Sequence, residues 1–415
     1  MIKKRKIYKQ SKDFRVNNSI KMKLTYAYVL LMIILVSITA LAIPEFEKDK
    51  GKVRVVAHTD QETSDALAKG CKVVRDAKVL KALVCSENIA SELGLQEDIR
   101  MFAMDSGANK QIRAALVHST GNVGKGRKVV VLDTGYNYNH SELSSSYLGG
   151  KDFVNNDNDP FDDNGHGSHV AGIITADGVD PKSKGVAPDT GIIAGKVLDK
   201  FGSGFFSDVV AAIYWAVDGP DGIAGTPDDF NADAISMSLG TGAPYLYKGF
   251  CDNVLPSMTN AIKYARNRGV VVVSASGNSG SAGVSLPGCI SYSTTIGAVD
   301  SSDKIASFSG RGRAVDLTAP GVNIFSAWLG NSYLTASGTS MATPMVSGTV
   351  ALIRFAHTNY TVTQTENALF KTAKDLGKVG KDDNFGWGRV DAYGAVNYIY
   401  SNREAKSKLN IERDG

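Results

Sequence analysis

Apolar runs that suit buried strands alternate with helix-like runs from residue 128 onward. The strand-like runs are KVVVLDTG, GIIAGKVLD, ADAISMSLG and GVVVVSASGN, and each ends in small or polar residues. The helix-like runs are HGSHVAGIITA, SDVVAAIYWAV, LPSMTNAIKYARNRG, SMATPMVSGTVALIRFAH and DAYGAVNYIY. Near-continuous apolar strands joined by helices predict an α/β fold. We expect a mainly parallel sheet with helices on both faces and functional residues at the carboxyl ends of its strands.

A different pattern precedes this region. The half-apolar run KVRVVAH is followed by a helix (ETSDALAKG), two strands (CKVVRDA and LKALVCS), a second helix (ENIASELGL) and a last strand (DIRMFAM). This βαββαβ order predicts a small α+β, ferredoxin-like domain over residues 43–108. The polar stretch from Asp105 to Gly126 predicts a linker, residues 109–400 form the larger domain, and the polar residues 401–415 form a frayed tail.

The first 42 residues are typical of an export signal. They carry nine Lys or Arg and one acid, and an uncharged apolar stretch of 18 residues runs from Tyr26 to Ile43. The small residues Ala40 and Ala42 favour cleavage after Ala42, whereas an uncleaved membrane anchor is the alternative because the stretch just spans a bilayer core. The chain's net charge of +4 lies in this leader, so nucleic-acid binding is not indicated.

Four cysteines are compatible with an oxidising compartment. Cys71 and Cys85 lie in the first predicted domain, and Cys251 and Cys289 lie in the second. One bridge within each domain is the simplest pairing, and four buried free thiols remain the alternative.

Candidate chemistry lies in four short segments. Asp133 follows a strand, Asn278 closes another, and His166 and Ser340 each begin a helix-like run. Taken singly, such residues are ordinary turn formers and caps. Together they supply a hydroxyl nucleophile, a base held by an acid, and an oxyanion donor. A zinc site at His166 and His169 is disfavoured, because no Glu lies between them and no third ligand is evident.

The order Asp133, His166, Ser340 is that of subtilisin. The segments VVVLDTG, GHGSHVAGI, SMSLG, SASGN, GTSMATP and FGWGRVDAYGA resemble the blocks of the subtilisin-like serine proteases, or subtilases, over about residues 110–400. The resemblance implies that Asp133 orients the imidazole, that His166 is the general base and then acid, and that Ser340 is the nucleophile. Asn278 and the Ser340 backbone N–H would form the oxyanion hole, and His169 would be structural.

The family resemblance also implies how substrate binds. An extended substrate backbone would add to an edge strand, and small residues would wall the pocket for the residue before the scissile bond (P1). The residues concerned are Ser238, Leu239, Gly240, Ala275, Ser276 and Gly277. We therefore expect an apolar P1 preference. The small domain resembles the family's propeptide, a folding template and inhibitor that is removed by self-cleavage, here between about Arg100 and Arg113.

Structural calcium is a further expectation. The insertion DGPDGIAGTPDDFNAD resembles a calcium loop of some archaeal subtilases, and hard carboxylate oxygens on a turning backbone suit Ca²⁺. Its candidate ligands are Asp218, Asp221, Asp228 and Asp229, and a solvated acidic turn is the alternative. The family's usual calcium loop after the His helix is replaced here by DGVDPKSKG, and Glu142 stands where an Asp is commoner.

The predicted protein is a secreted, monomeric serine endopeptidase made as a self-processing precursor. Its partners would be polypeptide substrates and its own propeptide, with no nucleic acid, and with membrane contact only through the N-terminal segment. Its chemistry needs no cofactor. A membrane-anchored processing protease of narrow specificity and a non-catalytic subtilase-like binding protein are the alternatives.

Overall fold

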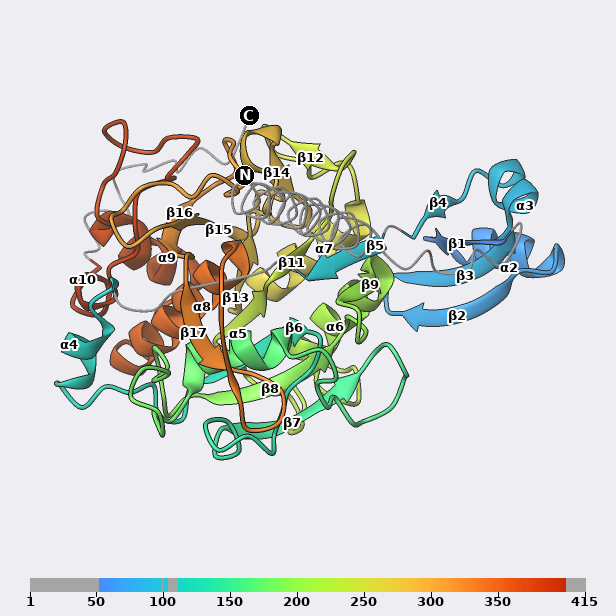
Figure 1. Ribbon diagram of the computed structural model, residues 1–415. Coiled ribbons are helices and arrows are strands. Elements are labelled where there is room, and N and C mark those ends of the chain that lie inside the picture. The colour runs from blue at the N-terminus through green and yellow to red at the C-terminus, as the bar shows by residue number, and fades with distance from the viewer. Residues whose placement is uncertain (1–51, 99, 104–110, 401–415) are drawn as a thin grey trace, which may run out of the picture. The chain divides into compact units, whose positions relative to one another are not determined.

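The computed structural model describes residues 52–98, 100–103 and 111–400 (Figure 1). The predicted leader, residues 105–110 of the predicted linker and the predicted tail lie outside these ranges. We refer below to residues 52–98 as the N-terminal subdomain and to residues 111–400 as the C-terminal domain.

A parallel sheet of seven strands forms the centre of the C-terminal domain, as the apolar runs predict. The strand order is β16-β15-β13-β10-β6-β8-β7, and every recorded pair is parallel. The strands are β6 (Lys128–Asp133), β7 (Tyr147–Asp152), β8 (Gly191–Lys196), β10 (Ala234–Met237), β13 (Val271–Ala275), β15 (Thr294–Val299) and β16 (Leu317–Pro320). The carboxyl ends of β6, β10 and β13 therefore lie next to one another at a single edge of the sheet.

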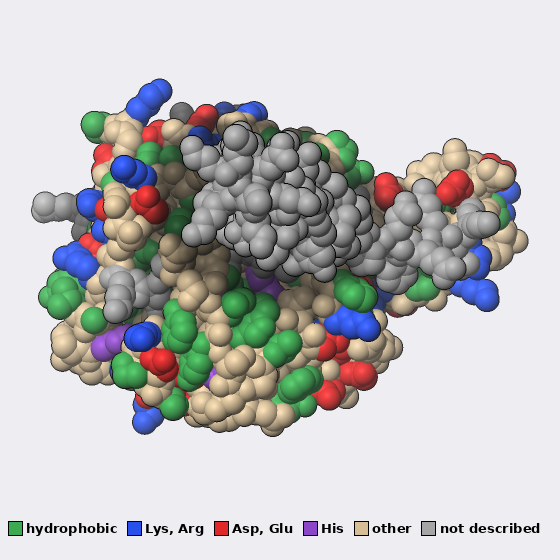
Figure 2. All heavy atoms as spheres, viewed as in Figure 1, with side chains coloured by type: hydrophobic (Ala, Val, Ile, Leu, Met, Phe, Trp, Pro, Cys, Tyr) green, Lys and Arg blue, Asp and Glu red, His purple; other side chains and the backbone are tan. Residues whose placement is uncertain are grey.

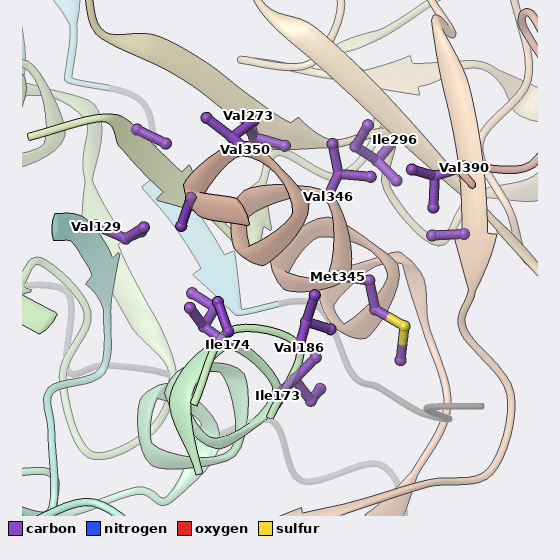
Figure 3. Packing of buried hydrophobic residues seen from close by; sticks show 14 of the residues in the cluster. Val129, Ile173, Ile174, Val186, Val273, Ile296, Met345, Val346, Val350 and Val390 are labelled. Atoms are coloured by element: carbon purple, nitrogen blue, oxygen red, sulfur yellow. The ribbon is translucent and has the colours of Figure 1, made fainter. Parts of the chain in front are cut away.

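Helices cover both faces of this sheet, because its strands are apolar on both sides. Along β6, Val130 and Leu132 face one cluster of buried residues, and Val129 and Val131 face the other. The first cluster contains α6 (Phe206–Asp218) and α7 (Pro256–Asn267). The second, part of which Figure 3 shows around α8, contains α4 (Ala114–His118), α5 (His166–Thr175), α8 (Thr339–Ala356), α9 (Val362–Thr372) and α10 (Ala392–Val396).

The N-terminal subdomain contains a four-stranded sheet in the order β2-β3-β1-β4. Its elements are β1 (Lys52–Ala57), α2 (Asp60–Ala68), β2 (Lys72–Ala77), β3 (Leu80–Ser86), α3 (Glu87–Glu92) and β4 (Gln96–Glu97). Thr59 and Glu62 form a capping box that starts α2. Leu83 and Ala66 pack in its small apolar core.

The last predicted strand of this subdomain, DIRMFAM, does not join the small sheet, which corrects the sequence interpretation; the strand that completes the sheet is β4, just before this run. Only β4 joins the small sheet, whereas β5 (Arg100–Ala103) pairs antiparallel with β9 (Ser203–Phe205) and β11 (Leu239–Gly240) of the C-terminal domain. Asp98 stands between β4 and β5, and its buried carboxylate accepts hydrogen bonds from Arg54 and from the backbone and hydroxyl of Ser207. The chain therefore leaves the small sheet after β4 and pairs with the C-terminal domain from Arg100 onward.

Three shorter features complete the fold. The strands β12 (Leu246–Tyr247) and β14 (Val284–Ser285) form one ribbon, and β17 (Ile324–Ala327) and β18 (Tyr333–Ala336) form another. Disulfides join Cys71 to Cys85 and Cys251 to Cys289, with Cα–Cα distances of 4.5 Å and 5.4 Å.

No helix within the described ranges is long and apolar enough to cross a membrane. On the face shown in Figure 2, basic and acidic side chains are interspersed.

Candidate active site

The sheet edge formed by β6, β10 and β13 brings together most of the predicted site. Asp133 ends β6, Ser238 follows β10, and Ser276 to Asn278 follow β13. The helices α5 and α8, which begin at His166 and Thr339, pack against each other over the same face. Residues more than 200 positions apart in the chain thus meet at one edge.

Asp133 and His166 form a buried pair. The Nδ1 atom of His166 lies 2.6 Å from Oδ1 of Asp133, and the two residues are 2% and 0% exposed. The same Asp133 oxygen accepts the backbone N–H of Thr134 at 2.7 Å. With Nδ1–H donating to the carboxylate, Nε2 is the ring nitrogen that can act as a base. Among the described residues, Oδ2 of Asp133 has no hydrogen-bond partner.

Asp162 orders the turn that leads into α5, and sequence reasoning missed it. Its buried carboxylate accepts hydrogen bonds from the backbone N–H groups of Asn164, Gly165 and Ser168 and from the hydroxyls of Thr134 and Ser168. The Thr134 hydroxyl in turn accepts the backbone N–H of Gly167 at 2.8 Å. Asp162 therefore connects the turn after Asp133 to the first turn of the His166 helix. The short spacing DDNGH was the available signal.

Ser340 is the second residue of α8, an 18-residue helix whose N-terminal end favours negative charge. The side chain is buried, and its Oγ donates a hydrogen bond to the carbonyl oxygen of Ser238 at 3.1 Å. The hydroxyl of Ser238 donates back to the carbonyl oxygen of Ser340 at 2.6 Å. This reciprocal pair fixes the start of α8 against the segment that carries the predicted substrate strand.

Asn278 is held by Thr339, the residue before Ser340. Its Oδ1 accepts the backbone N–H of Thr339 at 2.9 Å and the Thr339 hydroxyl at 3.1 Å. The Thr339 hydroxyl also accepts the backbone N–H of Gly277 at 3.1 Å. Because the amide oxygen is committed to α8, the Nδ2 donor is turned the other way. Sequence reasoning did not identify Thr339 as the residue that orients this amide.

The predicted pocket residues occupy two of these segments. Leu239 and Gly240 form β11, Ala275 ends β13, and Ser276 and Gly277 follow it. Gly277 has φ +91°, and a Cβ there would lie 2.0 Å from the Ser285 hydroxyl, so only glycine fits. None of these residues carries a charge, and all but Leu239 are small.

His169 packs inside the fold, as the sequence interpretation expected for a structural residue. Its Nε2 lies 3.2 Å from the Ile324 carbonyl oxygen and 3.0 Å from that of Leu334. Burial lowers the pKa of His169 to about 3, so the ring is neutral. Lys196 is a second buried titratable residue, and its ammonium group donates to the carbonyl oxygens of Thr134 and Leu198 and to Asp163.

The four predicted calcium ligands do not come together as one set. The two oxygens of Asp218 contact Lys78 and Tyr264, so this residue is directed away from the loop. Asp221, Asp228 and Asp229 accept hydrogen bonds from the loop itself, including from the Thr226 hydroxyl. Within the described residues, no group of three or more His, Cys, Asp or Glu side chains is arranged to hold a metal ion.

Glu142 takes the place expected for a calcium ligand, and its surroundings suit an anion. Its buried carboxylate accepts hydrogen bonds from the backbone N–H groups of Gly178, Val179 and Asp180 and from the hydroxyls of Ser183 and Tyr333. Burial raises the pKa of Glu142, but these donors outweigh it and the net shift is downward. The carboxylate therefore organises the loop after α5 through N–H donors, whereas a cation would require oxygen ligands.

Comparison with known proteins agrees with this arrangement. The model of the subtilase family matches residues 124–388. The chain is 40% identical over 274 residues to "Thermophilic serine proteinase" from Bacillus sp. (strain AK1), a match that covers 66% of this chain and 62% of the relative, or less than two thirds of its length.

Two other relatives are covered almost fully. Subtilisin Savinase from Lederbergia lenta is 36% identical over 286 residues, which make up 69% of this chain and 96% of the relative. Thermitase from Thermoactinomyces vulgaris is 37% identical over 278 residues, which make up 66% of this chain and 90% of the relative. The chain belongs to the subtilase family and is a subtilisin-like serine endopeptidase.

Proposed function

We propose that Asp133, His166 and Ser340 are the catalytic triad and that Asn278 supplies the oxyanion hole. The observation that carries this proposal is the buried 2.6 Å contact between Asp133 and His166, beside the helix that begins with Thr339 and Ser340. In the reaction, Ser340 Oγ leaves its hydrogen bond to Ser238, transfers its proton to His166 Nε2 and attacks the scissile carbonyl carbon.

The developing oxyanion is stabilised by two donors that are in place before the reaction. These are Asn278 Nδ2, oriented by the bonds from Thr339 to Oδ1, and the backbone N–H of Ser340 at the positive end of α8. His166 then gives its proton to the leaving amine, and Asp133 stabilises the transient imidazolium. A water molecule, activated in turn by His166, releases the acyl group from Ser340 and regenerates the enzyme.

We also propose that the protein is exported as a self-processing precursor in which residues 43–108 are the propeptide. The pairing of β5 supports this proposal, because the strand lies between β9 and β11 and adds to both as an extended substrate would. The leader, whose pattern is that of an export signal, lies outside the described residues, and the choice between cleaved signal and anchor stays a prediction.

Specificity follows from the same segments. Leu239, Ala275 and Gly277 carry no charge, and Ala275 and Gly277 are also small, so we propose a preference for Leu, Phe or Met before the scissile bond. Much faster cleavage after Lys or Arg in a matched peptide series would contradict this preference.

The decisive experiment compares the full chain with its Ser340→Ala variant. We expect the parent to release its N-terminal segment, with a new terminus between about Arg100 and Arg113, and then to cleave an apolar peptide. The variant should stay uncut and inactive while melting at a similar temperature. A variant that retains activity would overturn the triad, and an active parent that remains uncut would overturn the precursor proposal alone.

Structural calcium remains a prediction for Asp221, Asp228 and Asp229. One oxygen of each lies within 3.4 Å of the Thr226 hydroxyl, but within the described residues the three carboxylates are not arranged as a set that holds a metal ion. A lower melting temperature in chelator, abolished by Asp228→Asn, would support binding there. An unchanged melting temperature would count against it.

A further inference from the structure

The end of α6 is an unusual place for a buried carboxylate. Asp218 is the last residue of this helix and is 0% exposed, and the last helical turn contains no basic residue. The negative end of a helix disfavours an acid, and burial adds a desolvation cost. Among the described residues of the C-terminal domain, the hydroxyl of Tyr264 is its hydrogen-bond donor, at 2.5 Å. Arg268 of the same domain lies over the Tyr264 ring, 5.3 Å from its centroid, but makes no ion pair with Asp218, so within the described residues of this domain the carboxylate has no ion-pair partner.

Two tyrosine rings stand beside the carboxylate. Tyr214 lies one turn before Asp218 on α6, and Tyr264 comes from α7, with ring centroids 5.0 Å apart. A carboxylate next to aromatic rings suits an ammonium group, which can make an ion pair and a cation–π contact together. We call Tyr214, Asp218 and Tyr264 the α6–α7 socket.

The N-terminal subdomain supplies that ammonium group. Lys78 lies in the turn between β2 and β3, and its Nζ makes a close ion pair with Asp218 Oδ2. The same nitrogen lies 5.6 Å from the ring centroid of Tyr214 and 5.1 Å from that of Tyr264. The flanking residues Ala77 and Leu80 are buried in the same apolar cluster as Tyr214, so the turn is fixed in position.

We propose that the α6–α7 socket is a recognition site for a lysine side chain and that Lys78 of the propeptide is its ligand. The contact would hold the propeptide on the enzyme after the chain is cut. It is separate from the pairing of β5 with β9 and β11. This inference rests on the proposed self-processing precursor. It assigns to Asp218 a role in inhibitor binding in place of the predicted calcium ligation.

The other end of α6 makes a separate contact with the propeptide, which provides an internal comparison. Arg54 and Arg75 both bind Asp208 in the first turn of the helix. Acids are stable at that end of a helix even without a partner. Both ends of α6 therefore take their countercharge from the propeptide, but only at the Asp218 end does the helix dipole oppose the carboxylate.

The test measures the lag between self-cleavage of the full-length chain and the onset of peptide hydrolysis, which reports release of the cut propeptide. Lys78→Met keeps the apolar stem and removes the charge. Its matched control is Lys81→Met on the same hairpin, where Lys81 pairs with the exposed Asp76 inside the propeptide. We expect Lys78→Met to shorten the lag about five-fold or more and Lys81→Met to leave it unchanged.

A double-mutant cycle locates the effect at the socket. Asp218→Asn should also shorten the lag, and adding Lys78→Met to it should shorten the lag no further. Folding is checked in the Ser340→Ala background, where the Lys78→Met chain should still melt cooperatively, below the Lys81→Met chain. Equal lags for Lys78→Met and Lys81→Met, or full additivity with Asp218→Asn, would overturn the inference. A parent chain with no cut and no lag would instead overturn the precursor proposal.

Discussion

Asp162 influences His166 without touching its ring. Its carboxylate is shared by the turn after Asp133 and by the backbone that starts α5, so it sets the distance between the acid and the base of the site. Charge-assisted hydrogen bonds to backbone N–H groups are among the stronger interactions available for such positioning.

Replacing Asp162 by Asn should lower kcat while leaving KM nearly unchanged. The amide keeps one acceptor but presents donor hydrogens to donors such as the Ser168 N–H, which should cost about 1–3 kcal/mol of stability. We expect kcat to fall about 10- to 100-fold, because a small displacement of a group that takes part in proton transfer lowers the rate strongly. Steady-state kinetics on a peptide would measure this, with Asp159→Asn as the control, because the exposed Asp159 accepts a hydrogen bond from the half-buried Tyr138. A change in KM alone would contradict the positioning role.

Residues of this kind also mark how far the sequence could lead. Asp133, His166, Asn278 and Ser340 stand in short motifs whose local pattern indicates their chemistry. Asp162 lies in the short run DDNGH before the helix, but that run does not reveal its hydrogen bonds, which join the turn after Asp133 to the start of α5. The contacts of Asp218 could not be foreseen for the same reason, since its partners Lys78 and Tyr264 are distant in the chain.

At the scale of elements, the loop after α5 is built around a carboxylate. Glu142 gathers three backbone N–H groups from this loop, and the hydroxyl of Tyr333 joins it to the β17–β18 ribbon. Because the donors favour the ionised form, the pKa of Glu142 is lower than in an unfolded chain. Its contribution to stability is therefore full above about pH 4.5 and is lost as the pH falls through the lowered value.

Glu142→Gln should destabilise the fold in a pH-dependent way. At pH 7 we expect a loss of about 1–3 kcal/mol in the free energy of unfolding, because buried donors then face a neutral amide. The difference from the parent should shrink below pH 4 as the native carboxyl takes up a proton. Thermal unfolding from pH 3 to 8, in the Ser340→Ala background, would measure it against the exposed Asp189→Asn. A difference that stays constant with pH would argue against the charged acceptor.

The long apolar strands and helices were predictable, whereas the short elements were not. Continuous apolar runs indicate β6, β8, β10 and β13, because burial on both faces requires them. The helix α9 was overlooked although Thr361 and Gln364 form a capping box at its start. The strand β9 is only three residues long and no local periodicity indicates it, whereas β11 falls at Leu239 and Gly240, where the family resemblance implied an edge strand.

At the scale of the whole chain, the N-terminal subdomain contacts α6 through buried ionisable groups. Burial raises the pKa of Asp98 to about 6, against the opposing effects of Arg54 and Ser207. A raised pKa means that the contribution of Asp98 to stability is present below about pH 4 and is lost as the pH rises through about 6.

Asp98→Asn mimics the protonated carboxyl and should remove this dependence. Both chains are compared in the Ser340→Ala background. As the pH rises from 4 to 7, we expect the melting temperature of the chain with Asp98 to fall relative to that of the chain with Asp98→Asn. Differential scanning calorimetry over this range would show it, and the exposed Asp60→Asn should run parallel to the parent. The opposite trend is a melting temperature of the chain with Asp98 that rises relative to that of Asp98→Asn as the pH increases. It would mean that the ion pair with Arg54 outweighs the effect of burial on Asp98.

The position of β5 between β9 and β11 has a consequence for the proteins that this enzyme would cut. A guest segment in that place must be extended and must offer its backbone to neighbours on both sides. A helix or a paired strand cannot do so until it opens, and the free energy of local opening differs greatly along a native chain. The pocket proposed above is uncharged and selects side chains only loosely. The free energy of local opening would therefore decide which bonds are cut more strongly than the amino-acid sequence at those bonds. The enzyme would then act as a probe of the weakest parts of its substrates.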